Sequence, residues 1–178
     1  IAVLIFLLYS PFVKSAFAVD PVINEFLPNP PSGSPEWVEF YNASDASVDL
    51  SDYYFDDDTN FDSDSGSSPK VALSGGLPAL QACYWELSSY LNNNGDSPTL
   101  FKVQSGTSTS VDTYTYASSS AGLSYSRVPD GGSWVILQSP TKSSNKCIDL
   151  VPTSTPTPTL IPTSVPTSTP TQTPTPTK

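Results

Sequence analysis

The sequence predicts an all-β domain folded as a two-sheet sandwich, and three observations lead to this fold class. Short runs rich in Val, Ile, Tyr, Phe, Trp and Thr recur between clusters of Gly, Pro, Asn, Asp and Ser, the pattern of strands separated by turns. Stretches with the 3.6-residue periodicity of an amphipathic helix are missing. Two connections, 94–96 (NGD) and 129–132 (PDGG), supply residues that tolerate positive φ.

The expected strands are short and evenly spaced, and about nine of them favour a two-sheet sandwich. They cover residues 22–27, 36–42, 50–55, 70–73, 81–87, 99–103, 111–116, 123–128 and 134–137. In the second strand Val38 and Phe40 alternate with Trp37, Glu39 and Tyr41. One face of this strand is therefore expected to be apolar, while the other mixes aromatic rings with a carboxylate.

Residues 1–18 have the pattern of a secretory signal peptide. The apolar run 1–9 is followed by Ala16-Phe17-Ala18, a small-x-small sequence that signal peptidase accepts, which predicts cleavage after residue 18. Basic residues do not precede the run, so we expect an N-terminally incomplete signal; an uncleaved signal anchor is the alternative. Ser10 and Pro11 interrupt the run well before the roughly 20 apolar residues of a membrane span, and we expect no transmembrane span in the mature chain.

Residues 151–178 are almost wholly Pro, Thr and Ser, a composition that predicts a disordered, extended linker or stalk of the kind that carries O-linked glycans. Residues 19–150 remain for one globular domain with its own core. We therefore expect a signal peptide at 1–18, a β-sandwich at 19–150 and a stalk at 151–178. The product is expected to be secreted or at the cell surface, as a monomeric domain within a longer chain.

The charge of the chain restricts its partners. The net charge is −10, with 7 Lys and Arg against 17 Asp and Glu, and residues 20–64 contain acidic residues but no Lys or Arg. Such a surface repels phosphate backbones, so no direct nucleic-acid binding is expected. Calcium, basic partners and sugars stay open, and the expected partner is an unidentified protein or polysaccharide at the cell surface.

Two cysteines, Cys83 and Cys147, occur in this exported chain. Outside the reducing cytosol a single pair usually forms a disulfide, which here would tie the last segment of the domain to a central strand. The alternative is a buried free thiol at each position.

Seven sequence blocks, in this order and spacing, resemble the bacterial lamin-tail domain family. They are VINEFLPNP (22–30), EWVEFYNAS (36–44), VDLSDYYFDDD (48–58), LNNNGDSPTLF (91–101), VDTYTY (111–116), LSYSRVPDGGSW (123–134) and SPTKSSNKC (139–147). The resemblance implies an immunoglobulin-like β-sandwich that serves as a non-catalytic accessory module of secreted or surface proteins. The motif residues expected to have structural roles are Asn24, Glu25, Trp37, Glu39, Asn42, Gly95, Asp96, Arg127, Asp130 and Gly131.

Catalysis is not expected from this composition. Histidine is absent, which removes Ser-His and Cys-His nucleophile systems and the commonest general base near pH 7. A two-carboxylate glycoside hydrolase is the remote alternative, and its best pairs combine Glu36 or Glu39 with Glu25 or Asp130. The competing interpretation is that Glu25 and Glu39 accept backbone hydrogen bonds or pair with Arg127.

The acidic stretch at 56–66, DDDTNFDSDSG, resembles half of a calcium loop. Its oxygen ligands would come from alternating positions, Asp56, Asp58, Asn60, Asp62 and Asp64. The stretch lacks the glycine and the terminal glutamate of an EF-hand, and a solvated strand connection fits it equally well. Calcium is the one cofactor that the sequence suggests.

Aromatic residues suggest a ligand surface. Tyr53, Tyr54, Trp85 and Tyr90 could stack on sugars, although core packing is the commoner fate of large rings in a sandwich. Residues 42–44 (NAS) form a glycosylation sequon or a strand-end turn. The sequence thus predicts a non-catalytic binding or display module that contributes adhesion, matrix contact or positioning of an attached domain. The alternative is a ligand-free structural spacer in a longer surface protein.

Overall fold

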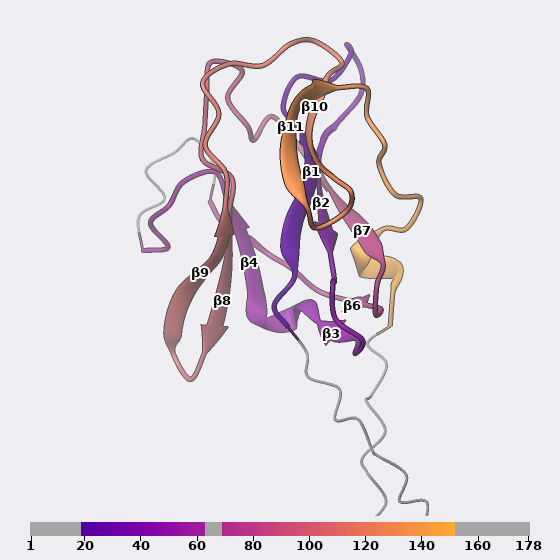
Figure 1. The fold of residues 1–178 in the computed structure, drawn as a ribbon. Helices are drawn as coiled ribbons and strands as arrows, with labels where there is room; N and C mark the ends of the chain where they lie inside the picture. Colours follow the sequence, from indigo (N-terminus) through magenta and orange to yellow (C-terminus); the bar gives the residue numbers. More distant parts are fainter. Residues whose placement is uncertain (1–18, 63–68, 152–178) are drawn as a thin grey trace, which may run out of the picture.

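A computed structural model of the chain describes residues 19–62 and 69–151, and eleven short strands with two 3-10 turns organise them. The predicted signal peptide and residues 152–178 of the predicted stalk lie outside the described residues. The strands form two larger antiparallel sheets that face each other as layers, together with one small sheet (Figure 1). The all-β sandwich predicted from the sequence is confirmed.

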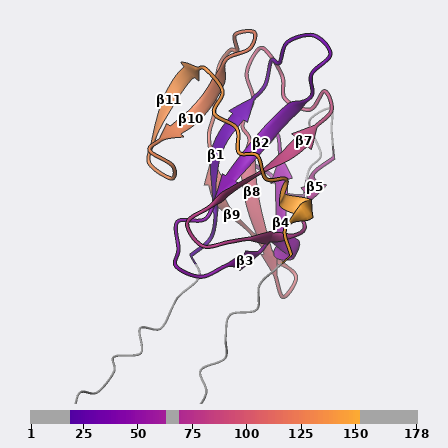
Figure 2. The same ribbon diagram turned by 90° about the vertical axis from the view of Figure 1, so that its right-hand side faces the viewer.

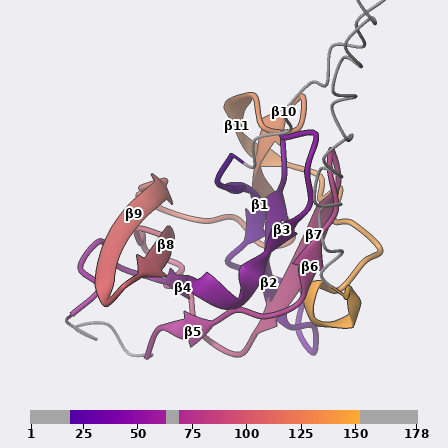
Figure 3. The same cartoon turned by 90° about the horizontal axis from the view of Figure 1, so that it is seen from below.

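The first sheet has the strand order β11-β10-β1-β2-β7. Its strands are β1 (Val22–Leu27), β2 (Glu36–Tyr41), β7 (Ala82–Leu87), β10 (Ser124–Val128) and β11 (Ser133–Gln138). The second sheet has the order β5-β4-β8-β9, from β4 (Tyr53–Asp56), β5 (Val71–Ala72), β8 (Thr99–Gln104) and β9 (Thr107–Thr113). The third pairs β3 (Val48–Asp49) with β6 (Gly76–Leu77). Figure 3 shows the layers from below, with β4, β5, β8 and β9 on one side.

The core fills the space between the two larger sheets. Val38 and Phe40 on β2, Phe55 on β4 and Leu100 on β8 are all fully buried, and the rings of Phe40 and Phe55 meet edge to face across the layers at 6.0 Å. Phe26 on β1 is the centre of an aromatic cluster with Tyr114, Tyr116, Tyr125 and Trp134. Burial of these rings supplies much of the hydrophobic free energy of folding.

The outer face of the first sheet is also covered. A segment at residues 139–146, here called the C-terminal strap, crosses β1, β2 and β7 (Figure 2). The Nζ atom of Lys142 lies 4.1 Å from the ring centre of Tyr84, and Tyr84 clusters with Leu27 and Trp37 on this face. Coverage by the strap explains why β2 is buried on both faces and carries mixed rather than strictly alternating polarity.

The observed strands differ from the expected ones in three places. β3 and β6 are two residues long and carry no periodicity. Residues 50–52 form the 3-10 turn η1 (Leu50–Asp52) instead of a strand, because the Asp49 side chain caps it by accepting from Ser51 N at 2.9 Å. β9 spans Thr107–Thr113 instead of the predicted 111–116, and it begins at Thr107 because Ser105 and Gly106, with φ of 52° and 78°, make a tight turn after β8.

The described domain begins and ends at the same pole. Near its start, Asp20 accepts a hydrogen bond from the Tyr53 hydroxyl at 2.5 Å, just after η1. Near its end, the carbonyl of Leu150 accepts from Gly76 N on β6, the strand that pairs with β3. Figure 1 shows both ends leaving at this pole.

Within the two described ranges, no helix is long and apolar enough to span a membrane.

Candidate functional site

Two buried carboxylates anchor the C-terminal strap. Glu25 and Glu39 are opposite each other on β1 and β2 and are 0% and 3% exposed. Glu25 accepts from the Ser124 hydroxyl at 2.5 Å, from Thr141 N at 2.9 Å and from the Thr141 hydroxyl at 2.6 Å. Glu39 accepts from Ser143 N at 2.6 Å. Both carboxylates therefore accept hydrogen bonds from the strap, which agrees with the interpretation that Glu25 and Glu39 accept hydrogen bonds from the backbone.

The other two carboxylates of the glycosidase alternative also have structural partners. Glu36 Oε2 accepts from the backbone N–H groups of Tyr90 and Leu91, both at 2.7 Å, and so holds the turn after β7. Asp130 is exposed and accepts from the Asn24 amide at 3.1 Å. Each of the four carboxylates accepts a hydrogen bond from another group of the domain, which supports structural roles for all four.

Burial raises the pKa of Glu39, and hydrogen bonds from Asn24 and Ser143 offset this only in part. Because its pKa lies above the ordinary value of 4.5, the folded protein binds this proton more tightly than the unfolded chain. The contribution of Glu39 to the free energy of unfolding therefore falls as pH rises from 4.5 through the folded pKa.

We expect Glu39→Gln to remove this fall. Urea unfolding at a series of pH values measures it: as pH rises over this range, the free energy of unfolding of the variant should increase relative to that of wild type. Glu86→Gln makes the same chemical change at an exposed position on β7 and should leave the wild-type slope unchanged. An equal slope in Glu39→Gln and wild type would contradict the assignment.

Arg127 pairs with Asp112, so of the two interpretations offered for Glu25 and Glu39 the structure has hydrogen bonds from the backbone and not a pair with Arg127. Its Nη2 lies 3.0 Å from Asp112 Oδ1, and both side chains are largely buried. Arg127 Nε also donates to the Ile23 carbonyl, and Asp112 Oδ2 accepts from Ile23 N. Since β10 and β1 belong to one sheet and β9 to the other, this pair clamps the two layers together. Asp112 was missed because nothing in its Thr- and Ser-rich strand points to Arg127.

Asn24 joins Glu39, Asp130 and Gly131 into one network. Its amide donates to Glu39 Oε1 at 2.7 Å, and its oxygen accepts from Gly131 N at 2.9 Å. Gly131 has a φ of 69°, which a glycine adopts without strain. Four of the motif residues thus fix the β10–β11 turn against β1 and β2.

Asn42 has a structural role at the end of β2. It is fully buried, and its amide donates to the carbonyls of Ala46, Leu77 and Pro78 at 2.7, 3.0 and 3.1 Å. Its oxygen accepts from Ser44 N and from the Ser44 hydroxyl. The sequon at 42–44 is therefore a strand-end turn in the folded domain, with the amide already occupied.

Gly95 and Asp96 shape the turn before β8. A Cβ atom at Gly95 would lie 2.8 Å from the Tyr116 carbonyl oxygen, and its φ is 119°, so the position requires glycine. Asp96 forms a two-way backbone bridge with Tyr116. Its carboxylate accepts from Asn92 N at 3.0 Å and from Ser97 N at 3.0 Å.

Cys83 on β7 and Cys147 form a disulfide across a sequence separation of 64 residues. Cys147 opens the 3-10 turn η2 (Cys147–Asp149), and Tyr84 N donates to the Asn145 carbonyl at 2.9 Å beside it. The strap is therefore fastened at one end by the disulfide and along its length by Glu25 and Glu39. A disulfide of this kind is typical of proteins outside the reducing cytosol.

The described residues of the predicted calcium loop are not grouped as one set of metal ligands. Asp56 is fully buried at the end of β4, whereas Asp58 Oδ1 accepts from Asn60 N at 2.6 Å and Asn60 Oδ1 accepts from Asp62 N at 3.2 Å. These contacts are local turns of an exposed segment. Asp64 lies outside the described residues. Within the parts of the chain that the structure describes, no group of three or more His, Cys, Asp or Glu side chains is arranged to hold a metal.

Asp57, which the alternating pattern passes over, is the unusual acidic residue of this region. It is 1% exposed, and neither of its carboxylate oxygens has a hydrogen-bond partner. Burial, together with the negative charges of Asp96 and Asp56, raises its pKa to about 7. Its position two residues after the fully buried Phe55 was the available signal, since alternate residues of an extended chain lie on the same face.

The aromatic residues suggested for sugar stacking do not form a common face. Tyr53 and Tyr90 are buried at 3% and 6% exposure, and Tyr54 packs edge to face on Phe61 at 5.4 Å. Trp85 is half-buried on β7, the edge strand of the other sheet. Trp85 lines a cleft of the described surface.

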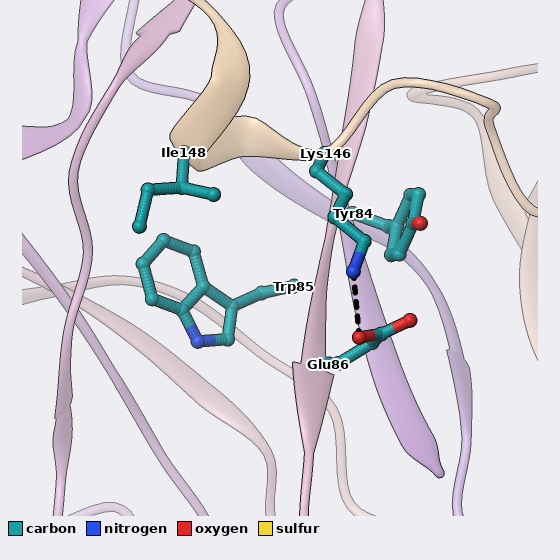
Figure 4. A pocket seen from close by; sticks show the side chains of 5 residues that line it. All are labelled: Tyr84, Trp85, Glu86, Lys146 and Ile148. Atoms are coloured by element: carbon teal, nitrogen blue, oxygen red, sulfur yellow. Dashed lines mark hydrogen bonds and ion pairs between the residues drawn. The ribbon is translucent and has the colours of Figure 1, made fainter. Parts of the chain in front are cut away.

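That cleft, here called the Trp85 cleft, has a volume of about 170 Å³ and is lined by Tyr84, Trp85, Glu86, Lys146 and Ile148. Figure 4 shows Ile148 next to the Trp85 ring, with the Lys146–Glu86 ion pair (2.8 Å) on the other side of β7. Ile148 is 61% exposed. The cleft combines an apolar wall with charged hydrogen-bonding groups at its rim. Lys146 and Ile148 were missed because the strap and η2 approach β7 only in the folded chain.

Comparison with protein families agrees with this geometry. The model of the Lamin Tail Domain family matches residues 15–151, which include all of the described strands and the disulfide. Searches of curated proteins and of solved structures found no match. The lamin tail domain is generally non-catalytic. Because the match spans well over half of its residues, the chain belongs to the lamin tail domain family.

Proposed function

We propose that this protein is a non-catalytic binding and display module outside the cytoplasm, and that it contacts a cell-surface polysaccharide through the Trp85 cleft. The observation that carries the proposal is the half-buried indole of Trp85 beside the exposed Ile148, with Lys146 and Glu86 at the rim. An indole face provides apolar area for the C–H face of a sugar ring. Lys146 and Glu86, which line the cleft from the other side of β7, supply donors and acceptors for hydroxyl groups of a sugar that extends past the strand.

The positions of the two domain ends favour a module that presents a binding surface over a spacer that lengthens the chain. A spacer gains length when the chain enters at one pole and leaves at the other, whereas here both ends lie at the pole formed by η1, β3 and β6. With both ends at one pole, the rest of the domain, including the opposite pole, extends away from the point where the chain enters and leaves. The disulfide supports an oxidising, extracytoplasmic compartment.

The fastening of the strap supports a preformed cleft. Cys147 is disulfide-bonded directly before Ile148, and Lys146 bridges to Tyr84 on β7. The two residues that complete the cleft therefore cannot move far from Trp85 without breaking covalent or backbone contacts. A preorganised site loses less conformational entropy on binding.

The test is a binding panel of soluble and insoluble polysaccharides, including cellulose, chitin and peptidoglycan, with the full chain and its Trp85→Ala variant. We expect at least one polysaccharide to bind and Trp85→Ala to weaken it by about tenfold, since an aromatic contact contributes on the order of 1 kcal/mol or more. Tyr54→Ala removes a half-buried ring from the opposite sheet and should bind as wild type. Binding that survives Trp85→Ala, or a panel with no binder, would contradict the proposal; a protein that binds in the cleft would redirect it.

A further inference from the structure

Three carboxylate oxygens at the end of β4 are buried without a hydrogen-bond partner. They are Asp56 Oδ2 and both oxygens of Asp57, from side chains that are 0% and 1% exposed. Asp56 Oδ1, in contrast, accepts from Asp57 N at 2.9 Å. Buried polar atoms in native proteins are nearly always satisfied, by protein groups, water or an ion. Three unsatisfied carboxyl oxygens on adjacent residues therefore indicate a missing partner, either a proton that the two groups share or a cation.

The surroundings of the pair supply further negative charge. Asp57 and Asp56 lie close enough for their carboxyl groups to interact directly, and Asp96 and Asp58 add negative potential. The turn that carries Asp96 is fixed beside the pair, because Ser97 N donates to the Asp57 carbonyl at 3.1 Å. An unpaired buried carboxylate is costly, and the raised pKa of Asp57, about 7, reflects that cost.

We propose that Asp56 and Asp57 form a calcium-binding seat at the end of β4, beside the turn that carries Asp96. Calcium is a hard cation that takes about six to eight oxygen ligands in flexible geometry, so the two carboxylates supply the charged ligands and water completes the shell. Asp58 is half-buried and Thr59 is exposed, which leaves a short path to solvent. This seat differs from the alternating set of the sequence pattern, whose Asp58 and Asn60 oxygens are used in local turns.

The ligand set predicts which variants lose the ion. The calcium-free full chain is titrated with CaCl₂ at pH 8 and its Tm is followed. Extracellular sites of this class bind with Kd on the order of 0.1–1 mM, and a concentration of ten times Kd should raise Tm by about 5 °C. Asp57→Asn and Asp56→Asn should abolish the calcium-dependent shift. Both variants remove a repelling charge, so we expect them to fold and to have a higher Tm than wild type without calcium.

Asp62→Asn is the matched control, because it removes an exposed carboxylate from the same segment and should keep the full calcium-dependent shift in Tm.

Terbium luminescence excited through tyrosine gives a second measurement, which reports where the bound ion lies. The Tyr90 hydroxyl lies 3.3 Å from Asp56 Oδ1, so Tyr90→Phe should change the sensitised emission of a bound ion. Loss of the shift in Asp62→Asn with retention in Asp57→Asn would place the ion in the exposed loop and overturn the proposal. Absence of any shift in wild type would leave the pair sharing a proton and would also overturn it.

Discussion

Removal of the Cys83–Cys147 disulfide should lower the free energy of unfolding by about 4 kcal/mol, the largest single effect that we expect. The bond closes a sequence separation of 64 residues, and in the chain-entropy model a loop of this length restricts the unfolded ensemble by about that amount. Both cysteines are fully buried, so Cys83→Ala with Cys147→Ala also avoids leaving two buried thiols in contact. Urea unfolding of the double variant measures the loss.

Wild type unfolded with and without a reductant is the control for that experiment. The reduced wild type and the double-alanine variant should be destabilised to a similar degree, while the reductant should leave the variant unchanged. A loss below about 1 kcal/mol in both would show that the strap is held by Glu25 and Glu39 without help from the disulfide.

Arg127→Met should lower the free energy of unfolding by about 3 kcal/mol, because it leaves the carboxylate of Asp112 buried without its ionic partner. Arg127 also donates to the carbonyls of Ile23 and Gly132, which lose their donors in the variant. The two sheets lose their clamp at this edge. The measurement is urea unfolding, and Lys146→Met, which breaks an exposed ion pair, should have little effect by comparison.

A double-variant cycle separates the clamp from simple loss of packing. If the pair acts as a unit, Arg127→Met combined with Asp112→Leu should cost less than the sum of the two single changes, because no unpaired charge is left buried. Strictly additive losses would contradict the clamp.

The sequence predicted the fold from signals that are local. Alternating side chains and turn residues located β1 at its observed bounds, and the family motif located the residues of the β10–β11 turn. Local signals fail where an element is too short for a pattern, as in β3 and β6. They fail also where a side chain competes with the strand, as Asp49 does when it caps η1.

The candidate sites depended on contacts that a linear pattern does not contain. Arg127 and Asp112 belong to different sheets, and Ile148 reaches Trp85 through the disulfide-anchored η2. In the acidic segment, burial could not be predicted from the alternating pattern. The side-chain oxygens of Asp58 and Asn60 accept hydrogen bonds in local turns, whereas Asp57 is buried next to the turn that carries Asp96. The disulfide was predictable because the sequence predicts export and contains two cysteines, which leaves one possible pair.

The most direct test of a binding module that acts through the Trp85 cleft is amide NMR mapping of the full chain, titrated with a polysaccharide that binds in the panel. The account predicts chemical-shift changes concentrated at residues 84–86 and 146–148, on β7 and η2. Changes concentrated in the loops at 28–35 and 117–122, with residues 84–86 and 146–148 unaffected, would contradict it.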